Sequence, residues 1–191
     1  MKDQNGVILP HLQKHPQIPS SCYIDPSARL NGDIVMGENC SVWFHCSLRG
    51  DVHEIRIGNR TNVQDNCVFH TTYKKYPLHI GDDVSFGHGV IAHGCTIKNR
   101  VLVGMGSIIM DDATIGEDVL IGAGSLVTER KTIPPGVLVL GRPARVIRDL
   151  TEAERKMVAD RAWQYAAYVQ AYRDQGKFCG WSDHPLNCTE P

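Results

Sequence analysis

Apolar residues recur at every sixth position over most of this chain. The series is Ile24, Leu30, Met36, Val42 and Leu48, then Ile57, Val63 and Phe69, then Ile80, Phe86 and Ala92, and finally Ile97, Val103, Ile109, Ile115, Ile121, Val127, Ile133 and Val139. This period is neither the 3.6 residues of an amphipathic helix nor the alternation of an open sheet. A short fixed repeat with one inward apolar residue per unit is typical of a parallel β-helix, so we predict that fold class.

The repeat has defined limits and interruptions. Three extra residues follow Leu48, five extra residues lie in the loop 71–79, and the register slips by one residue just before Ile97. Glycine often follows the apolar position, and we expect it in the tight turns. We therefore predict an all-β repeat over residues 22–148, preceded by an irregular lead-in at 1–21.

The hexapeptide pattern resembles that of left-handed β-helix proteins, which have three faces and about 18 residues per coil. The left hand follows from this resemblance alone, since the usual crossover rule favours the right hand. Residues 24–139 would then make about six to seven coils.

A helix is predicted after the repeat. Thr151 to Glu154 has the pattern of a capping box, and an amphipathic helix over 150–175 follows and ends at Gly176. We expect a loosely ordered tail at 176–191. The helix has a stripe of residues able to pack alongside the β-helix, made by Met157, Ala162, Tyr165, Tyr168 and Tyr172.

Composition narrows the class of protein. A length of 191 residues and a net charge of −1 indicate one domain without electrostatic attraction for nucleic acid. No apolar run approaches the roughly 20 residues that span a membrane, and the N-terminal stretch has no secretory pattern. The seven cysteines are odd in number and form no C-x-x-C pair, so we expect mostly reduced thiols in a cytoplasmic protein, with a disulfide framework as the alternative.

Counting repeat units places two histidines on one edge of the β-helix. His70 and His93 each follow an inward apolar residue, and those two apolar positions are three hexads plus the inserted loop apart. With three hexads per coil, the two side chains stack at the strand spacing of about 4.8 Å, close enough to share one metal ion. Arg49 continues the same edge one coil away from His70.

His88 lies on a different corner. His88 and Asp65 each lie two residues after an inward apolar residue, one coil apart, so we expect them to stack, with Gln64 adjacent. Within one narrow prism His88 is too far from the other two histidines. We infer that a second subunit supplies it, so that His70 and His93 of one chain meet His88 of a neighbour in a trimer.

Three histidines predict a particular chemistry. Three neutral imidazoles leave an open position in a tetrahedral zinc site, which is the catalytic type. Zinc bound in this way lowers the pKa of water to about 7 and so makes a nucleophile. A single histidine in a β-helix turn is more often a polar surface residue, and we interpret His11, His15 and His184 in that way.

Several motifs resemble those of the γ-class carbonic anhydrases and their close relatives. They are L-R-G-D at 48–51, N-V-Q-D at 62–65, His70, F-G-H at 86–88 and A-H-G-C at 92–95. The resemblance covers about residues 7–175. It implies a homotrimer with one metal ion per subunit interface, Zn2+ or alternatively Fe2+ or Co2+, which hydrates carbon dioxide reversibly to bicarbonate. It makes His70, His88 and His93 the ligands, and Tyr165 a tyrosine that approaches the pocket, with Tyr168 as the alternative.

The resemblance also implies roles for four residues around the ligands. Gln64 would orient the hydroxide, and Asp65 would form a hydrogen bond near the site. Arg49 and Asp51 would form an intersubunit ion pair that supports the site, and Arg49 is also a candidate to hold bicarbonate. The simpler interpretations are a surface salt bridge for Arg49 and Asp51, and plain helix packing for Tyr165.

One departure from the family affects the expected rate. Its best-known members have a long acidic loop after the first histidine, with a glutamate that shuttles protons. Here the loop 71–79 has two lysines and no acid, and Val52 stands where such members have a second acid. Because proton export limits fast hydration, we expect a slow carbonic anhydrase or none, with His53 or His79 as substitute shuttles.

Three other functions stay open. The first is a related metal-dependent acyl-CoA ester hydrolase or an accessory protein of the same fold. The second is a hexapeptide acyltransferase, because G-R-P-A-R at 141–145 also occurs there, although such enzymes use a single histidine. The third is a metal-binding or assembly protein without catalytic activity.

Overall fold

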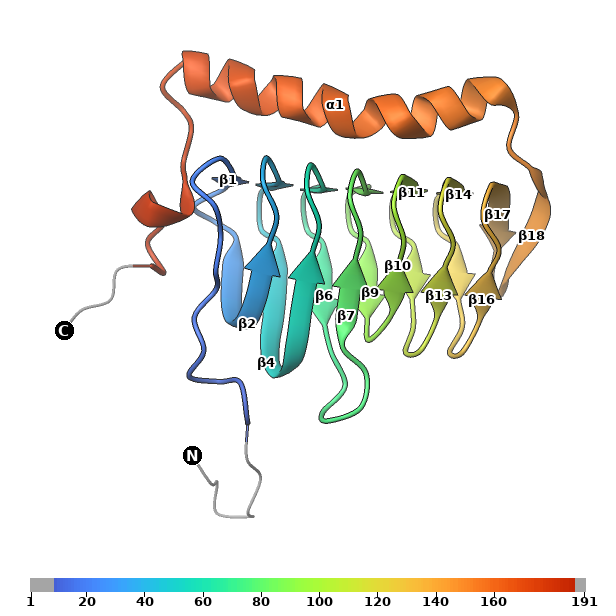
Figure 1. Ribbon diagram of the computed structural model, residues 1–191, viewed down its shortest axis with the longest axis horizontal. Helices are drawn as coiled ribbons and strands as arrows, with labels where there is room; N and C mark the ends of the chain where they lie inside the picture. Colours follow the sequence, from blue (N-terminus) through green and yellow to red (C-terminus); the bar gives the residue numbers. More distant parts are fainter. Residues whose placement is uncertain (1–8, 188–191) are drawn as a thin grey trace.

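The computed structural model describes residues 9–187 and shows stacked short strands with one long helix beside them (Figure 1). The strands are β1 (Tyr23–Ile24), β2 (Arg29–Met36), β3 (Ser41–Val42), β4 (Ser47–Ile57), β5 (Asn62–Val63), β6 (Val68–His70), β7 (Leu78–Ile80), β8 (Ser85–Phe86), β9 (Ile91–His93), β10 (Thr96–Ile97), β11 (Val101–Val103), β12 (Ile108–Ile109), β13 (Thr114–Ile115), β14 (Val119–Ile121), β15 (Leu126–Val127), β16 (Thr132–Ile133), β17 (Val137–Gly141) and β18 (Ala144–Asp149). The helices are α1 (Glu152–Asp174) and the short 3-10 helix η1 (Trp181–Asp183).

The strands form three faces. One face has the order β1-β3-β5-β8-β11-β14-β17, all parallel, and β18 adds to its end antiparallel. The other two faces share the long strands β2 and β4, because β4 pairs with β6 near its start and with β7 near its end. From there β6-β9-β12-β15 and β7-β10-β13-β16 continue as separate faces. The predicted left-handed parallel β-helix with a C-terminal helix alongside is confirmed.

The core is the predicted hexad series. Every residue of that series is buried, and none is more than 5% exposed. Phe69 and Phe86 lie edge to face inside the coil, with ring centroids 4.7 Å apart. The cysteines within the described residues are free thiols, and five of the six are buried in agreement with their expected packing role: Cys22, Cys40, Cys46, Cys67 and Cys95.

The glycines after the apolar positions serve close contact between coils as well as turns. A Cβ on Gly104 would lie 2.5 Å from the backbone nitrogen of Ala123 on the next coil. The left-handed backbone conformation comes two residues later, at Gly106 with a φ of 66°. The expectation that the first of these glycines makes the tight turn is therefore wrong at this corner, where that glycine lets the coils touch.

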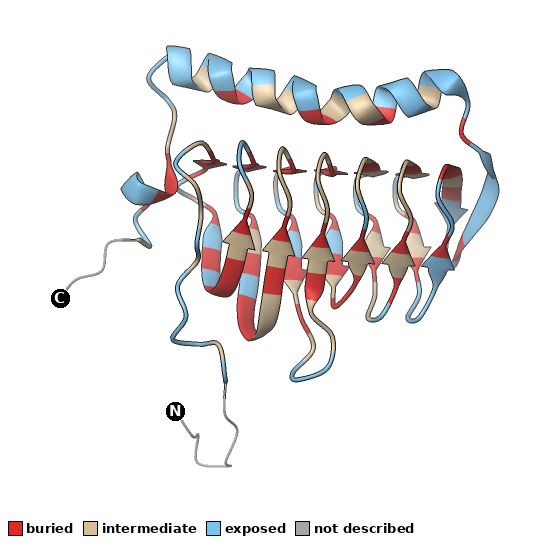
Figure 2. Ribbon diagram, in the orientation of Figure 1, coloured by how far each residue is buried: buried red, intermediate tan, exposed pale blue. Residues whose placement is uncertain are grey.

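Helix α1 packs on β3, β8, β11 and β14. Thr151 and Glu154 cap it reciprocally, as the capping box predicts. Figure 2 shows its buried residues on the side that faces the sheet. None of the helices within residues 9–187 is long and apolar enough to cross a membrane.

The packed stripe of α1 differs in part from the predicted one. Val158, Ala162 and Val169 are the buried residues. The predicted Met157 and Tyr168 are 37% and 44% exposed. Tyr165 and Tyr172 do face the β-helix, where they join a second apolar cluster around Tyr23 and Trp43.

Part of the segment after α1 packs against the first coil. Trp181 of η1 and His184 are buried, with their rings stacked 4.9 Å apart. His184 Nε2 lies 3.2 Å from the carbonyl oxygen of Asp25, so this histidine is a buried part of the first coil and not a surface residue. At the other end Gln17 bridges to Val35. Residues 1–8 of the lead-in and 188–191 of the tail lie outside the described residues.

Candidate functional site

His70 and His93 lie side by side at the ends of β6 and β9. The two strands pair in parallel with these residues in register. His70 Nδ1 is 3.1 Å from His93 Nε2, and the ring centroids are 5.1 Å apart. This is the stack that the count of repeat units predicts, and it gives two imidazole nitrogens that face each other.

Each of these histidines has a carboxylate partner. His93 Nδ1 lies 2.6 Å from Asp111 Oδ1, and His70 Nε2 lies 3.2 Å from Asp51 Oδ1. Thr72 donates a hydrogen bond of 2.7 Å to the second oxygen of Asp111. A carboxylate on one ring nitrogen fixes the proton there and leaves the other nitrogen free to bind a metal. His93 Nε2 is therefore a prepared donor atom, which fits a metal that takes imidazole ligands.

Charge around His70 favours its neutral form. Burial is the largest cause that lowers the pKa of His70, and the positive charge of Arg49 lowers it further. Burial alone would raise the pKa of Asp51, but hydrogen bonds from Arg49 and His70 outweigh it and lower that pKa. A neutral imidazole beside an ionised carboxylate is the protonation state that metal binding requires.

Arg49 and Asp51 pair within this chain. Arg49 Nη1 lies 3.0 Å and 2.8 Å from the two carboxylate oxygens of Asp51. Within the chain both partners belong to one strand, β4, and the pair between subunits that the resemblance implies stays a prediction. Asp51 thereby joins Arg49 to His70.

Sequence reasoning missed Asp111. It lies on the coil after His93. Ile109 pairs with Ala92, so the next residue, Met110, is level with His93, and Asp111 lies one residue further along. The spacing of one coil would have found it, but the register slip near Ile97 hides the alignment. Between the two coils a Cβ on Gly94 would collide with the Asp111 carboxylate, so only glycine leaves room for this pair.

His88 and Asp65 form a separate pair on another corner. His88 Nδ1 lies 2.8 Å from Asp65 Oδ2, and the side chains are 49% and 31% exposed. The predicted contact between them is present. Within residues 9–187 no three His, Cys, Asp or Glu side chains gather into a metal-binding cluster. The single chain thus holds two facing histidines and, elsewhere, a third that is half exposed.

Gln64 and Tyr165 line a cavity beside His88. The cavity is about 300 Å³ and lies between α1 and the corner that follows β8, β11 and β14. Gln64 is buried and donates to Asn62 Oδ1 at 3.3 Å. Burial raises the pKa of the Tyr165 phenol. The structure therefore brings Gln64, His88 and Tyr165 together and keeps them apart from the pair His70 and His93.

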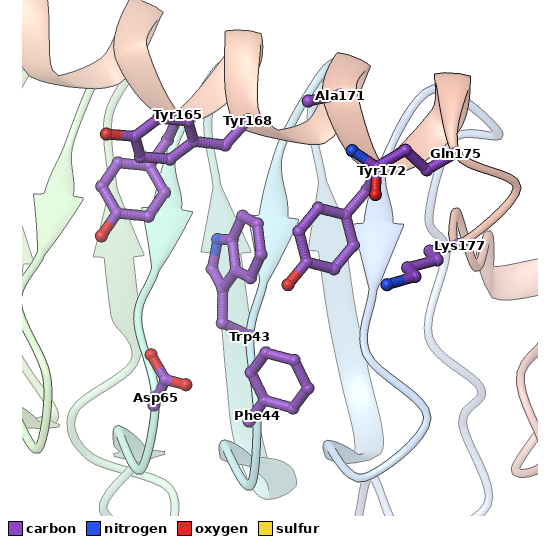
Figure 3. A pocket seen from close by; sticks show the side chains of 9 residues that line it. All are labelled: Trp43, Phe44, Asp65, Tyr165, Tyr168, Ala171, Tyr172, Gln175 and Lys177. Carbon is purple, nitrogen blue, oxygen red and sulfur yellow. The ribbon is translucent and has the colours of Figure 1, made fainter.

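A second cavity of about 490 Å³ lies on the other side of Tyr165. Figure 3 shows it between α1 and the β-helix, with Trp43, Tyr168 and Tyr172 around it and Asp65 at its base. Tyr165 lines both cavities, whereas Tyr168 lines only the second.

The candidate proton shuttles lie near the corner between β4 and β7. His79 Nε2 is 2.8 Å from Glu54 Oε1, and the His53 ring nitrogen Nδ1 accepts a hydrogen bond from the Glu54 amide. His53 is linked to the residue after His70 only through its carbonyl oxygen, which accepts from Thr71 at 3.4 Å. The acid at this corner is Glu54, which lies outside the loop 71–79.

Comparisons with known proteins agree with the hexapeptide fold. The family model for bacterial transferase hexapeptide (six repeats) matches residues 94–129. Protein YrdA of Escherichia coli (strain K12) is 44% identical, over 90% of this chain and 97% of that protein. The carbonic anhydrase of Geobacillus kaustophilus (strain HTA426) is 47% identical, over 87% and 91%. A crystal structure of a hexapeptide transferase family protein from Anaplasma phagocytophilum has a TM-score of 0.78 and 41% identity, over 82% and 92%.

Proposed function

We propose, because this chain belongs to the γ-class carbonic anhydrase-like family of hexapeptide-repeat proteins, that it catalyses metal-dependent hydration of carbon dioxide. The reaction joins one carbon dioxide and one water into bicarbonate and releases one proton. The family membership supports a metal cofactor, and zinc, with Fe2+ or Co2+ as alternatives, is the ion that we propose at His70, His88 and His93.

One observation supports this proposal most strongly. His70 Nδ1 and His93 Nε2 face each other at 3.1 Å, and a carboxylate holds the other nitrogen of each ring. Histidines that are oriented in this way are typical of metal sites, in which such carboxylates fix the tautomer. A structural role alone would not need two partnered imidazoles with facing nitrogens at a surface corner.

The third ligand comes from a second copy of the chain in this proposal. His88 is half exposed on another corner, and its only charged partner within residues 9–187 is Asp65. A homotrimer with cyclic symmetry brings one such corner of each chain against the His70 corner of the next. Each interface would then hold one complete three-histidine site.

The chain's own residues position the reactants. A metal ion bound by three neutral histidines supplies water of lowered pKa, near 7, as the nucleophile. Asp111 and Asp51 hold the ligand rings, and Gln64, fixed by Asn62, presents its amide to the cavity beside His88. Asp65 orients His88, and Arg49 holds Asp51 and offers a positive charge to bicarbonate.

Proton release limits the rate in this proposal. The residues of loop 71–77 include no acid, whereas His79 and Glu54 form a hydrogen-bonded pair at the neighbouring corner. We therefore propose slow hydration with His79 and Glu54 as the proton route, and His53 as the alternative. Replacing His79 with Ala and finding an unchanged dependence of turnover on buffer concentration would remove His79 from this role.

A second candidate is an acyl transfer or ester hydrolysis activity at the corner of His88. The two cavities beside Tyr165, of about 300 and 490 Å³, are larger than carbon dioxide needs. The match to the transferase hexapeptide model over residues 94–129 keeps this candidate open. This candidate differs from carbon dioxide hydration in its substrate. A hydrolytic reaction would depend on His70, His88 and His93 as hydration does, and an acyl transfer would not.

Metal analysis of protein purified without oxygen, followed by stopped-flow hydration with Zn2+, Fe2+ and Co2+ forms, tests the proposal. We expect about one metal ion per chain and carbon dioxide hydration that a chelator removes. Metal-free protein that is fully active as an acetyltransferase would contradict the proposal. Stoichiometric metal without hydration would leave the accessory or hydrolytic function.

A further inference from the structure

Arg161 is a half-buried cation without a counterion. Of the arginines within residues 9–187, three others are half-buried, and each of them pairs with a carboxylate: Arg56, Arg60 and Arg100. No carboxylate of the described chain lies within 4 Å of the Arg161 guanidinium, by the same ion-pair criterion. A partly desolvated guanidinium favours an anionic partner, and its planar fork suits a carboxylate in particular.

The position of Arg161 directs this charge into the cavity beside His88. Arg161 and Tyr165 are one helical turn apart on α1, and both line that cavity. The guanidinium is near enough to the Tyr165 phenol to favour its ionised form, against the larger effect of burial. The Tyr165 hydroxyl has no hydrogen-bond partner within the described residues, so it is available as a second donor to an anion.

Apart from Arg161, Tyr165, Gln64 and His88, the lining of this cavity is glycine and apolar side chains. The cavity has a volume of about 300 Å³, and its apolar lining comes from the coils: Leu102, Met105, Leu120 and Ala123, together with Val103 and Ile121 of the inward series. Bicarbonate would fill only a small part of this volume and would gain nothing from aliphatic walls. A cavity of this size with few polar groups is at the lower end of sites for organic molecules.

We propose that this cavity binds a small organic carboxylate with an aliphatic chain. Its carboxylate lies on Arg161 and the Tyr165 hydroxyl, and its chain lies against Leu102, Leu120 and Met105. This ligand site goes beyond carbon dioxide hydration. It shares its cavity with His88 and Gln64, but its carboxylate binds Arg161 and Tyr165, neither of which is a proposed metal ligand.

Calorimetric titration of the full chain with bicarbonate, acetate, butyrate, hexanoate and hexanol tests the proposal. Each titration is done with metal present and after chelation. We expect affinity to rise about three- to fourfold per methylene from acetate to hexanoate, equally in both metal states. We expect Arg161→Gln to weaken hexanoate binding at least tenfold and to leave hexanol binding unchanged.

Three further variants make the result specific. Lys156→Gln removes one positive charge from the exposed side of the same helix, where Lys156 pairs with Asp160, and should leave binding unchanged. Arg161→Lys should restore part of the affinity, and Leu120→Ser should flatten the dependence on chain length. Circular dichroism and light scattering verify that each variant keeps its fold and assembly.

Three results would overturn the proposal. Bicarbonate binding as tightly as hexanoate would exclude the aliphatic part. Hexanoate binding that disappears on chelation would place the carboxylate at the metal. Hexanoate affinity that is equal in the wild type, Arg161→Gln and Lys156→Gln would exclude Arg161. None of these readouts uses hydration activity, so failure of the proposed reaction would be seen separately.

Discussion

The two halves of the β-helix differ in regularity and in chemistry. From Ile97 to Val139 the apolar residues keep a strict spacing of six, and the strands are two to five residues long. Before that point β2 and β4 have eight and eleven residues, and loop 71–77 is inserted between β6 and β7. All three candidate ligand histidines lie in this irregular half.

The interruptions supply what a regular repeat cannot. Regular coils place equivalent positions in columns, so they stack His70 on His93 and bring Asp111 of the regular half to His93, but they provide no partner for His70. The extra residues of β4 bring Asp51 to His70, and the inserted loop brings Thr72 to Asp111. Regular coils therefore give stability and one orienting carboxylate, Asp111, and departures from regularity give Asp51 and Thr72, which complete the site.

The largest expected effect separates stability from function. Replacing Ile121 with Ala removes a fully buried side chain from the regular half and should cost about 2–5 kcal/mol in the free energy of unfolding. Metal stoichiometry of the remaining folded protein should not change. Urea unfolding and metal analysis measure the two quantities. A loss of metal from folded Ile121→Ala protein would show that the halves are not independent.

The next effect concerns the site where the two halves meet. Asp111→Asn removes the carboxylate 2.6 Å from His93 Nδ1 and should weaken metal binding by about 10- to 100-fold. The matched control is Asp112→Asn, because Asp112 is exposed and asparagine tolerates its φ of 58°. Competition with a chelator of known affinity measures both variants. Equal affinities for the two would remove Asp111 from the site.

A smaller effect compares two left-handed glycines. Gly94 (φ 52°) and Gly106 (φ 66°) both tolerate alanine poorly, at about 1–2 kcal/mol each. At Gly94 the added methyl also meets the Asp111 carboxylate and the Tyr76 side chain, whereas at Gly106 nothing lies within 4 Å. Gly94→Ala should therefore be less stable than Gly106→Ala and should alone lose metal affinity. Thermal unfolding and chelator competition distinguish them, and identical behaviour would contradict this explanation.

The smallest effect depends on pH. Although burial raises the pKa of Asp33, hydrogen bonds from Arg56, Lys14 and His11 lower it overall. Lys14 and His11 tie the lead-in to β2, and Arg56 ties β4 to β2. A lowered pKa in the folded state means that Asp33 stabilises the protein above the unfolded value of about 3.9, and that this contribution disappears as the pH falls through the folded value. Asp33→Asn should thus be less stable than the wild type at pH 7, with the difference shrinking below about pH 4.

Its control is Asp160→Asn, which removes an exposed pair with Lys156 on α1. We expect that variant to match the wild type within about 0.5 kcal/mol at both pH values. A stability difference for Asp33→Asn that stays constant from pH 7 to pH 3 would show that the lost contribution is not electrostatic.

The sequence was sufficient where one physical rule decides the outcome. An inward position every six residues has to be apolar, so the buried series could be read directly, and equal coil lengths put His70 beside His93. The contact of His88 with Asp65 follows from the same count. The fold and the main candidate residues were accessible for this reason.

The sequence was insufficient where several weak preferences compete. On α1, Val158 and Val169 are buried while Met157 and Tyr168 are exposed, because strands that are distant in the sequence, β3, β8, β11 and β14, decide which side of the helix is covered. His184 is buried by Trp181 and by the first coil, which are distant in the sequence. Arg161 can be identified as a candidate binding residue only from the structure, which shows that it has no counterion within the described residues.

Mixed trimers test the central claim most directly. His70→Ala and His88→Ala chains should each lose metal and activity when purified alone. Refolded together in equal amounts, they should regain about a quarter of the wild-type metal content, since a quarter of the interfaces combine an intact His70 with an intact His88 from the next chain. Verified mixed trimers that bind no metal would contradict a site shared between subunits.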